Sequence, residues 1–272
     1  MLRTRIATGL VLLGLLVVVL FVLPPVAGSL FFGAALLVGA WEWARFAGLA
    51  RPLGRLAYVA GTAVLGAATY RATRSVTDLH WVLGIACVWW LVAAAWLALR
   101  PAAVSGLSAV LAGQLVLVPT GIAIDRLLAG GALAGGAGLL LCMLLLVWAA
   151  DTGAYFVGRR FGRLKLAPAV SPNKTWEGAI GGTALAALVA IGEAHWLGLP
   201  VVPYLGLGFV VVCASIIGDL TESMFKRVAG LKDSGALLPG HGGVLDRIDS
   251  ITAAAPFYVL GLSWFGTAGW AA

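Results

Sequence analysis

Long apolar segments follow one another through the chain, separated by short breaks that contain proline, glycine or charged residues. A membrane-spanning helix needs about 20 mostly apolar residues, whereas barrel strands would alternate apolar and polar positions. These segments do not alternate, so the pattern predicts an all-α, polytopic integral membrane bundle of about nine transmembrane helices. We expect the spans at residues 4–23, 27–47, 54–70, 80–99, 104–124, 137–158, 175–197, 202–228 and 250–269.

Basic residues are distributed unevenly between the two ends of these spans. With a cytoplasmic N-terminus, all but three of the 18 Lys and Arg residues fall at cytoplasmic ends; the exceptions are Arg71, Arg74 and Arg126. Cytoplasmic segments of membrane proteins carry such an excess, so the distribution predicts this orientation. The first apolar segment is uncharged for 18 residues, longer than the apolar part of a signal peptide, and we expect it to be a retained span.

The composition excludes several classes of protein. Hydrophobic residues make up 61% of the chain and charged residues 11%, whereas a soluble domain has about a quarter charged residues. A soluble enzyme, a disordered chain and a coiled coil are therefore excluded. The net charge of +7 is an orientation signal in a membrane protein, and we expect no nucleic-acid partner.

Acidic residues divide the chain into two parts. Only three of the 11, Glu42, Asp78 and Asp125, precede residue 150. We therefore expect residues 1–130 to serve packing and assembly, and residues 131–272 to form a catalytic region with cytoplasmic loops at 159–174 and 229–249. Polar loops beside rigid helices are frequent sites of function.

The end of the eighth expected span carries a polar face. At 100° per residue, Asp219, Glu222, Ser223, Lys226 and Arg227 fall on one side of the helix, with apolar residues on the other. A solvated helix end with internal ion pairs is one interpretation. An acid at the edge of a bilayer is costly unless it is paired or hydrated, which favours a functional site.

The following loop is rich in glycine and ends in two aspartates. Gly240, Gly242 and Gly243 surround His241, and such a loop can direct several backbone N–H groups toward one anion. His241 itself could be a general base, a phosphate donor or a structural turn residue.

Asp246 and Asp249 share a helix face if the ninth span begins near them. With Asp219 they would form an all-oxygen pocket of the kind that suits Mg²⁺. Four basic side chains alternate with these acids and would hold phosphate oxygens: Lys226, Arg227, Lys232 and Arg247. This combination is typical of phosphoryl- or nucleotidyl-transfer sites.

The same residues resemble the motif of the phosphatidate cytidylyltransferases (CDP-diacylglycerol synthases). The match has no gap and includes Ser223, Lys226, Arg227, Lys232, Asp233, Gly235, Leu238, Pro239, His241, Gly242, Gly243, Asp246, Arg247 and Asp249. Residues 151–178 are similar to the family's other shared region. The N-terminal half resembles the family only in hydropathy.

The resemblance implies transfer of the cytidylyl group of CTP to phosphatidate, releasing pyrophosphate. It implies Mg²⁺ as the cofactor and leaves open whether a second cation is bound. It also implies a homodimer in the bacterial inner membrane with a cytoplasmic active site. With the residue pattern, it assigns catalysis to Asp219, Asp246, Lys226, Ser223 and His241, substrate binding to Arg227, Lys232, Asp233, Arg247, Lys174, Asp151 and Tyr155, and the metal to Asp219, Asp246 and Asp249. Asp151 and Tyr155 share a helix face, for which a structural hydrogen-bonded pair is the alternative.

Two other functions are compatible with parts of this pattern. A CTP-dependent polyprenol kinase, or a cytidylyltransferase acting on another lipid phosphate, would need similar groups. A kinase would release CDP instead of pyrophosphate. A transporter is less consistent with the sequence, because it has no obvious repeat and its charges lie near one membrane face instead of the midplane.

Overall fold

The computed structural model describes residues 2–99, 101, 103–130 and 135–265, with side chains from residue 6 onward. Within these ranges the chain forms nine α-helices and one two-stranded sheet. The helices are α1 (Leu2–Phe21), α2 (Pro25–Trp43), α3 (Pro52–Ala72), α4 (Val76–Leu99), α5 (Gly106–Ala129), α6 (Gly135–Phe161), α7 (Trp176–Leu197), α8 (Val201–Val228) and α9 (Leu245–Ser263). Each overlaps one expected span, in the same order; residues 266–269 of the ninth span lie outside the described residues.

Six of the described helices are long and apolar enough to cross a membrane: α2, α4, α5, α6, α7 and α8. The apolar part of α1, Ile6–Phe21, is shorter than a typical span. The first five residues of α9 include three charged ones, Asp246, Arg247 and Asp249. The helices therefore indicate an integral membrane protein, whereas nine membrane crossings stay a prediction.

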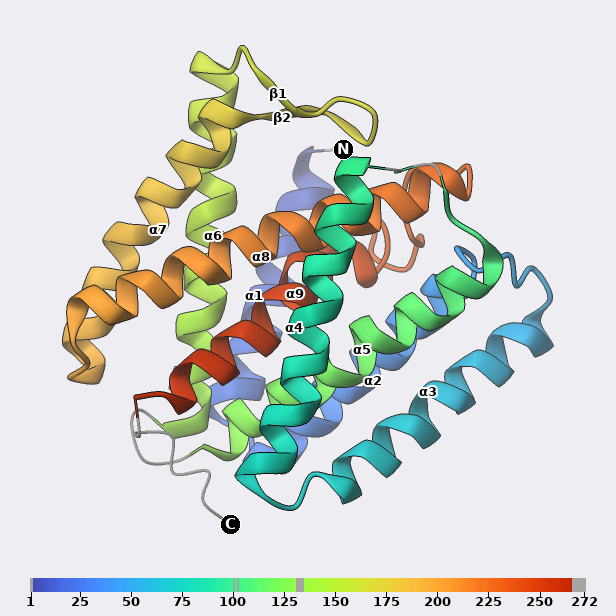
Figure 1. Cartoon of the computed structure of the whole chain (residues 1–272), viewed down its shortest axis with the longest axis horizontal. Helices are drawn as coiled ribbons and strands as arrows, with labels where there is room; N and C mark the ends of the chain where they lie inside the picture. Colours follow the sequence, from blue (N-terminus) through green and yellow to red (C-terminus); the bar gives the residue numbers. More distant parts are fainter. Residues whose placement is uncertain (1, 100, 102, 131–134, 266–272) are drawn as a thin grey trace.

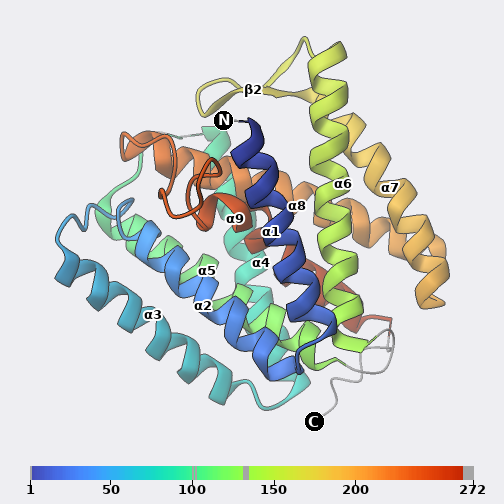
Figure 2. The same cartoon turned by 180° about the vertical axis from the view of Figure 1, so that it is seen from behind.

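Successive helices run in alternating directions, so the connections gather at the two ends of the bundle. The start of α1, the hairpin between α6 and α7, and the loop between α8 and α9 lie at the same end (Figure 1 and Figure 2). Helix α8 crosses the bundle obliquely and packs along α9. The loop between α8 and α9, residues 229–244, carries much of the motif and is called the motif loop below. It thus lies near residues of the 151–178 region.

Helix α9 packs against helices from both halves of the chain. It contacts α8 and α6 from the C-terminal half, and α2, α4 and α5 from the N-terminal half. The buried core continues across this junction, where Leu117 of α5 and Leu245 of α9 belong to the same cluster. The N-terminal helices therefore directly support the helix that carries Asp246 and Asp249.

The loop expected at 159–174 contains a β-hairpin, so the fold is nearly all-α instead of wholly α-helical. Strands β1 (Lys165–Ala167) and β2 (Ser171–Thr175) pair antiparallel, with Lys165 opposite Thr175. The Thr175 hydroxyl then accepts a hydrogen bond from Gly178 N at 3.2 Å, which caps the start of α7. These short strands lack clear alternation of apolar and polar residues, which is the usual sequence signal for a strand.

Glycines allow α6 and α7 to pack with their backbones in close contact. A Cβ atom added to Gly153 would lie 2.6 Å from Gly181 O, and one added to Gly182 would collide with Ala150 O. Small residues at a helix seam allow this close approach in membranes. The seam brings Asp151 of α6 toward the hairpin and its Lys174.

Candidate active site

The polar face expected on α8 is present, and its ionisable groups are paired. Ser223 Oγ donates a hydrogen bond to Asp219 Oδ1 at 3.3 Å, and Lys226 Nζ lies 3.2 Å from Glu222 Oε1. Glu222 is 2% exposed and Lys226 is 8% exposed. The solvated-end interpretation is therefore wrong for these two residues, because they lie inside the protein against α9.

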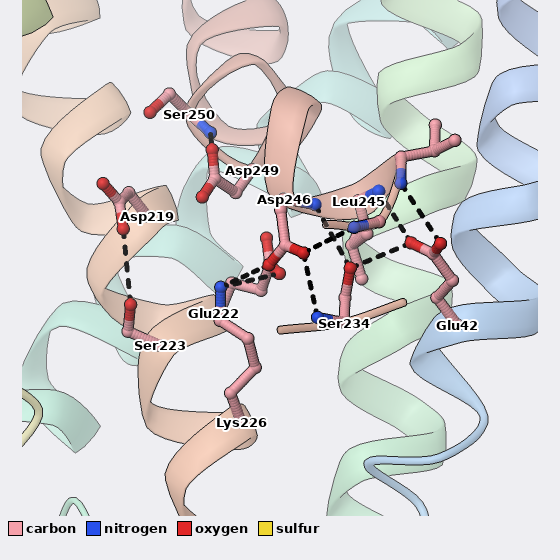
Figure 3. A network of polar contacts seen from close by, with 12 residues as sticks. Glu42, Asp219, Glu222, Ser223, Lys226, Ser234, Leu245, Asp246, Asp249 and Ser250 are labelled. Carbon is pink, nitrogen blue, oxygen red and sulfur yellow. Dashed lines mark hydrogen bonds and ion pairs between the residues drawn. The ribbon is translucent and has the colours of Figure 1, made fainter. Parts of the chain in front are cut away.

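Asp246 and Asp249 share a face of α9, as the spacing predicts, and this face is turned to α8. Gly218 makes the close approach possible, because a Cβ atom there would lie 2.6 Å from Asp249 O and 2.9 Å from the Ala253 Cβ. Figure 3 shows Asp219, Asp249 and Asp246 on the facing sides of the two helices. The three aspartates therefore lie on the facing sides of two neighbouring helices, and their joint binding of a metal ion stays a prediction.

Both carboxylate oxygens of Asp246 accept hydrogen bonds. Oδ1 accepts from Lys226 Nζ at 2.7 Å, and Oδ2 accepts from Gly243 N at 2.8 Å and Ser234 N at 2.9 Å. Desolvation raises the pKa of Asp246, but the hydrogen bonds and the Lys226 charge outweigh it, so the pKa lies below its usual value. Asp246 is therefore an ionised group that joins α8, α9 and the loop between them.

The glycines of the motif loop have a geometric role. Gly242 has a φ of 84°, and a Cβ atom on it would lie 2.6 Å from Asp246 Oδ2. His241 lies in the same turn, where its backbone N donates to Leu238 O at 2.9 Å. Its buried ring Nδ1 has no hydrogen-bond partner within the described structure. These contacts agree with a turn residue, and a catalytic role for His241 stays a prediction.

Lys174 joins the two regions of the sequence that carry the family resemblance. It lies on β2, and its Nζ is 2.6 Å from Asp219 Oδ2 on α8. Lys174 also lines a cavity of about 550 Å³ between α6, α7, α8 and the hairpin. The other polar side chains in its wall are Asp151, Tyr155, Arg159, Asn173 and Thr175.

Asp151 and Tyr155 both face this cavity but do not form the pair that was one alternative. The Tyr155 hydroxyl instead accepts a hydrogen bond from Arg159 Nη1 at 2.8 Å. Tyr155 is 57% exposed, so its ring lies open to the surroundings. Their assignment to substrate binding stays a prediction, and it is consistent with the position of both side chains in the cavity wall.

A second, more strongly apolar groove of about 850 Å³ adjoins this cavity. It is lined by α4, α7, α8 and the hairpin turn, and Leu166, Ala179 and Ile216 line both spaces. A cavity with charged side chains in its wall and an apolar groove therefore lie side by side, next to the Lys174–Asp219 ion pair.

The remaining basic residues of the motif are at the surface. Arg227, Lys232 and Arg247 are exposed, as is Asp233. Arg227 Nε lies 3.5 Å from Val170 O in the hairpin turn. Their predicted contacts with phosphates are compatible with this exposure and stay predictions.

Sequence reasoning missed two residues that hold the motif loop, Glu42 and Ser234. Glu42 of α2 is 4% exposed, and its carboxylate accepts hydrogen bonds from Ser234 Oγ at 2.9 Å and Leu245 N at 2.8 Å. Ser234 is fully buried. The one available signal was an acid at the end of an apolar segment, where an unpaired charge is costly.

The donor chemistry at the site fits a divalent cation. Four carboxylates (Asp219, Glu222, Asp246, Asp249) face two ammonium groups (Lys174, Lys226), which leaves two formal negative charges. Apart from the ion pair with Lys226, the two buried Glu222 oxygens have no hydrogen bond. Within the described residues no three His, Cys, Asp or Glu side chains already form a metal site. An all-oxygen set with this excess charge nevertheless has the chemistry that Mg²⁺ requires.

The fold and the site thus define a membrane-embedded helical protein with a buried carboxylate–lysine centre at one end of the bundle. The sequence matches the Cytidylyltransferase family over residues 3–265, and the chain belongs to that family.

Several relatives carry the name phosphatidate cytidylyltransferase. The protein from Pseudomonas aeruginosa is 46% identical over 285 aligned positions, which cover 100% of both chains. The protein from Haemophilus influenzae is 40% identical and covers 95% of this chain and 97% of its own. The protein from Brucella suis is 51% identical over 124 residues, 44% of this chain and 45% of its own.

Proposed function

We propose that this chain transfers the cytidylyl group of CTP to phosphatidate, forming CDP-diacylglycerol and pyrophosphate for phospholipid synthesis. One observation carries the proposal: a cavity with charged side chains in its wall and an apolar groove share a wall beside the Lys174–Asp219 ion pair. The charged side chains of the cavity suit a nucleotide, and the groove suits acyl chains. The full-length relatives named phosphatidate cytidylyltransferase support the same substrates.

In the reaction, a phosphate oxygen of phosphatidate attacks the α-phosphorus of CTP. A new P–O bond forms, the α–β phosphoanhydride bond breaks, and its electron pair leaves with pyrophosphate. The second pKa of a phosphate monoester is about 6, so the nucleophile is already ionised near neutral pH. The protein therefore needs to manage charge between two anions more than it needs a strong base, and His241 need not be that base.

The chain's own groups supply this charge management. Lys174 and Lys226 place ammonium groups among the carboxylates of α8 and α9. Ser223 lies one turn beyond Asp219, where its hydroxyl can donate to a phosphate oxygen. Arg227, Lys232 and Arg247 receive phosphate charge at the surface, where Asp233 is also exposed. Asp151 and Tyr155 line the cavity beside Lys174.

Asp219, Asp246 and Asp249 would hold Mg²⁺. When bound, the ion neutralises phosphate charge and orients the triphosphate. Asp246 already has three hydrogen bonds, whereas none of those observed reaches Asp249 Oδ2. Asp249 therefore has the most available carboxylate oxygen of the three, whereas a metal ion at Asp219 would displace Ser223 or Lys174 from it. Asp246 would fix the surroundings of both.

We further propose that the protein crosses the bacterial inner membrane nine times and works as a homodimer. The hairpin and the motif loop lie at the same end of the bundle as the start of α1 (Figure 2). The excess of basic residues in the segments at this end supports a cytoplasmic location. CTP would then enter from the cytoplasm and phosphatidate from the inner leaflet.

The test is incubation of the purified protein in detergent with phosphatidate, labelled CTP and Mg²⁺, following both products. We expect equal amounts of CDP-diacylglycerol and pyrophosphate. Release of CDP with a phosphorylated lipid would instead identify a kinase, and solute uptake into vesicles without lipid turnover would identify a transporter.

A further inference from the structure

We propose that Glu42, in the N-terminal half of the chain, is a positioning residue for the active site; the inference rests on the proposed function. Glu42 lies in the last turn of α2 and none of its contacts is with substrate-facing groups. Its carboxylate instead holds the two ends of the motif loop, at Ser234 and at the start of α9 (Figure 3). Through this loop it acts on Asp246.

Helix α9 lacks a side-chain cap from its own N-terminal segment. Its N-cap residue, Val244, makes no side-chain hydrogen bond. Glu42 supplies the missing acceptor from a distant part of the sequence, with Oε1 accepting from Val244 N at 3.1 Å and Oε2 from Leu245 N at 2.8 Å. Free N–H groups at a helix start need such an acceptor, and a negative charge there is favoured by the helix dipole.

Ser234 connects Glu42 with Asp246. Its hydroxyl donates to Glu42 Oε2 at 2.9 Å and accepts from Asp246 N at 3.3 Å, while its own backbone N donates to Asp246 Oδ2 at 2.9 Å. Arg45, one turn after Glu42, donates from Nη1 to Ser234 O at 3.0 Å. Glu42 of α2 and Arg45 of the turn after α2 therefore both hold Ser234, and Ser234 in turn holds Asp246.

The space around the Glu42 carboxylate is fully used. A Cβ atom on Gly235 or Gly243 would collide with it. The loop can therefore approach Glu42 only in this arrangement, which leaves Asp246 Oδ1 2.7 Å from Lys226 Nζ. A displaced Glu42 carboxylate would move Asp246, and with it the charge that Asp246 presents to Lys226.

The test compares two buried glutamates that receive the same substitution. In Glu42→Gln, one acceptor oxygen becomes an NH₂ group facing donors, so the loop must shift. Glu193→Gln is the matched control: Glu193 is 5% exposed and accepts from the Tyr204 hydroxyl at 3.0 Å. Glu193 lies in the last turns of α7 (Trp176–Leu197), and that end of α7 is the one far from the hairpin (Figure 1).

We expect Glu42→Gln to lower kcat about 10- to 100-fold, the effect of misplacing a catalytic group by about 1 Å. The KM values for CTP and phosphatidate should change much less. Glu193→Gln should leave kcat within about twofold, because it reaches no active-site group. Ser234→Ala should reproduce the Glu42→Gln defect, and the double variant should be no worse than either single variant, because the two residues act through one path.

Three results would overturn the inference: a kcat for Glu42→Gln within twofold of the parent protein, an equal loss in Glu193→Gln, or multiplied losses in the double variant. If Glu42→Gln does not fold, Ser234→Ala alone decides in the same way. If the parent protein forms no CDP-diacylglycerol, the proposed function fails separately. Hydrogen exchange over residues 231–246 then decides: faster exchange in Glu42→Gln than in Glu193→Gln supports the inference, and equal exchange refutes it.

Discussion

Replacing Lys226 with methionine should destabilise the folded protein as well as stop turnover. Lys226 Nζ lies 2.7 Å from Asp246 Oδ1 and 3.2 Å from Glu222 Oε1. The Glu222 side chain is 3% exposed and that of Asp246 is 6% exposed. Methionine matches the length of the lysine stem but removes the charge, so two nearly buried carboxylates would lose their shared counter-ion.

The size of the effect follows from this burial. Removing one partner of a buried ion pair costs about 3–5 kcal/mol, because the other charge remains without compensation. In a protein of 150–250 residues each kcal/mol lowers the melting temperature by about 2–4 °C. Lys226→Met should therefore lower it by roughly 6–20 °C. Adding Glu222→Gln removes one of the stranded charges, while Asp246 keeps its two backbone N–H donors, so the double variant should recover part of the loss.

The assay is thermal unfolding of the purified protein in one detergent, with Lys232→Met as the control. Lys232 is exposed in the same loop, and surface substitutions usually change stability very little. If Lys226→Met melts within the error of Lys232→Met, the two carboxylates do not depend on Lys226, and the buried ion-pair network is wrong. If Glu222→Gln fails to restore any stability, the charge argument is wrong even though the site is sensitive.

Two further predictions test the metal-site residues and the helix seam. Asp219→Asn should lower turnover about 10²-fold or more, the loss typical of removing one electrostatic contact to the transition state. The melting temperature should hardly change, because the part-exposed Lys174 can be solvated instead. Near-normal activity at ordinary Mg²⁺ would reject the metal assignment. Gly182→Ala should destabilise the protein by about 1–3 kcal/mol, because its Cβ would collide with Ala150 O. Gly192→Ala on the same helix meets nothing within 4 Å and should stabilise it by about 0.5–1 kcal/mol; chemical unfolding of both variants checks the opposite signs.

The helical architecture could be predicted because each helix has its own apolar segment. Every expected span overlaps one described helix, and the breaks at Pro24 and Pro200 directly precede α2 and α8. The hairpin at 165–175 could not be predicted, because it depends on contacts that follow from the tertiary structure. Leu164 N donates to the Glu177 carboxylate at 3.1 Å, and neither residue shows this partnership in its local sequence.

The site was predictable to the extent that its residues are close in sequence. The polar face from Asp219 to Lys226 follows from helical geometry alone, and the Asp246–Asp249 spacing places both acids on one face. The packing that turns these faces toward each other depends on Gly218, whose missing side chain admits Asp249 O. A glycine in an apolar span gives no indication of which helix will approach it.

The role of Glu42 could not be predicted from its local sequence. It belongs to a segment that composition assigns to packing, and its partners Ser234 and Leu245 are 192 and 203 residues away. The expectation that the N-terminal half only packs and assembles therefore needs revision if Glu42 positions Asp246. A charged residue at an apolar helix end must find donors somewhere, and here it finds them in the N–H groups and the hydroxyl of the motif loop. Because the buried Glu42 carboxylate needs hydrogen-bond donors, it binds the motif loop of the C-terminal half. The geometry of the C-terminal motif thus depends on an N-terminal helix that is not part of the motif.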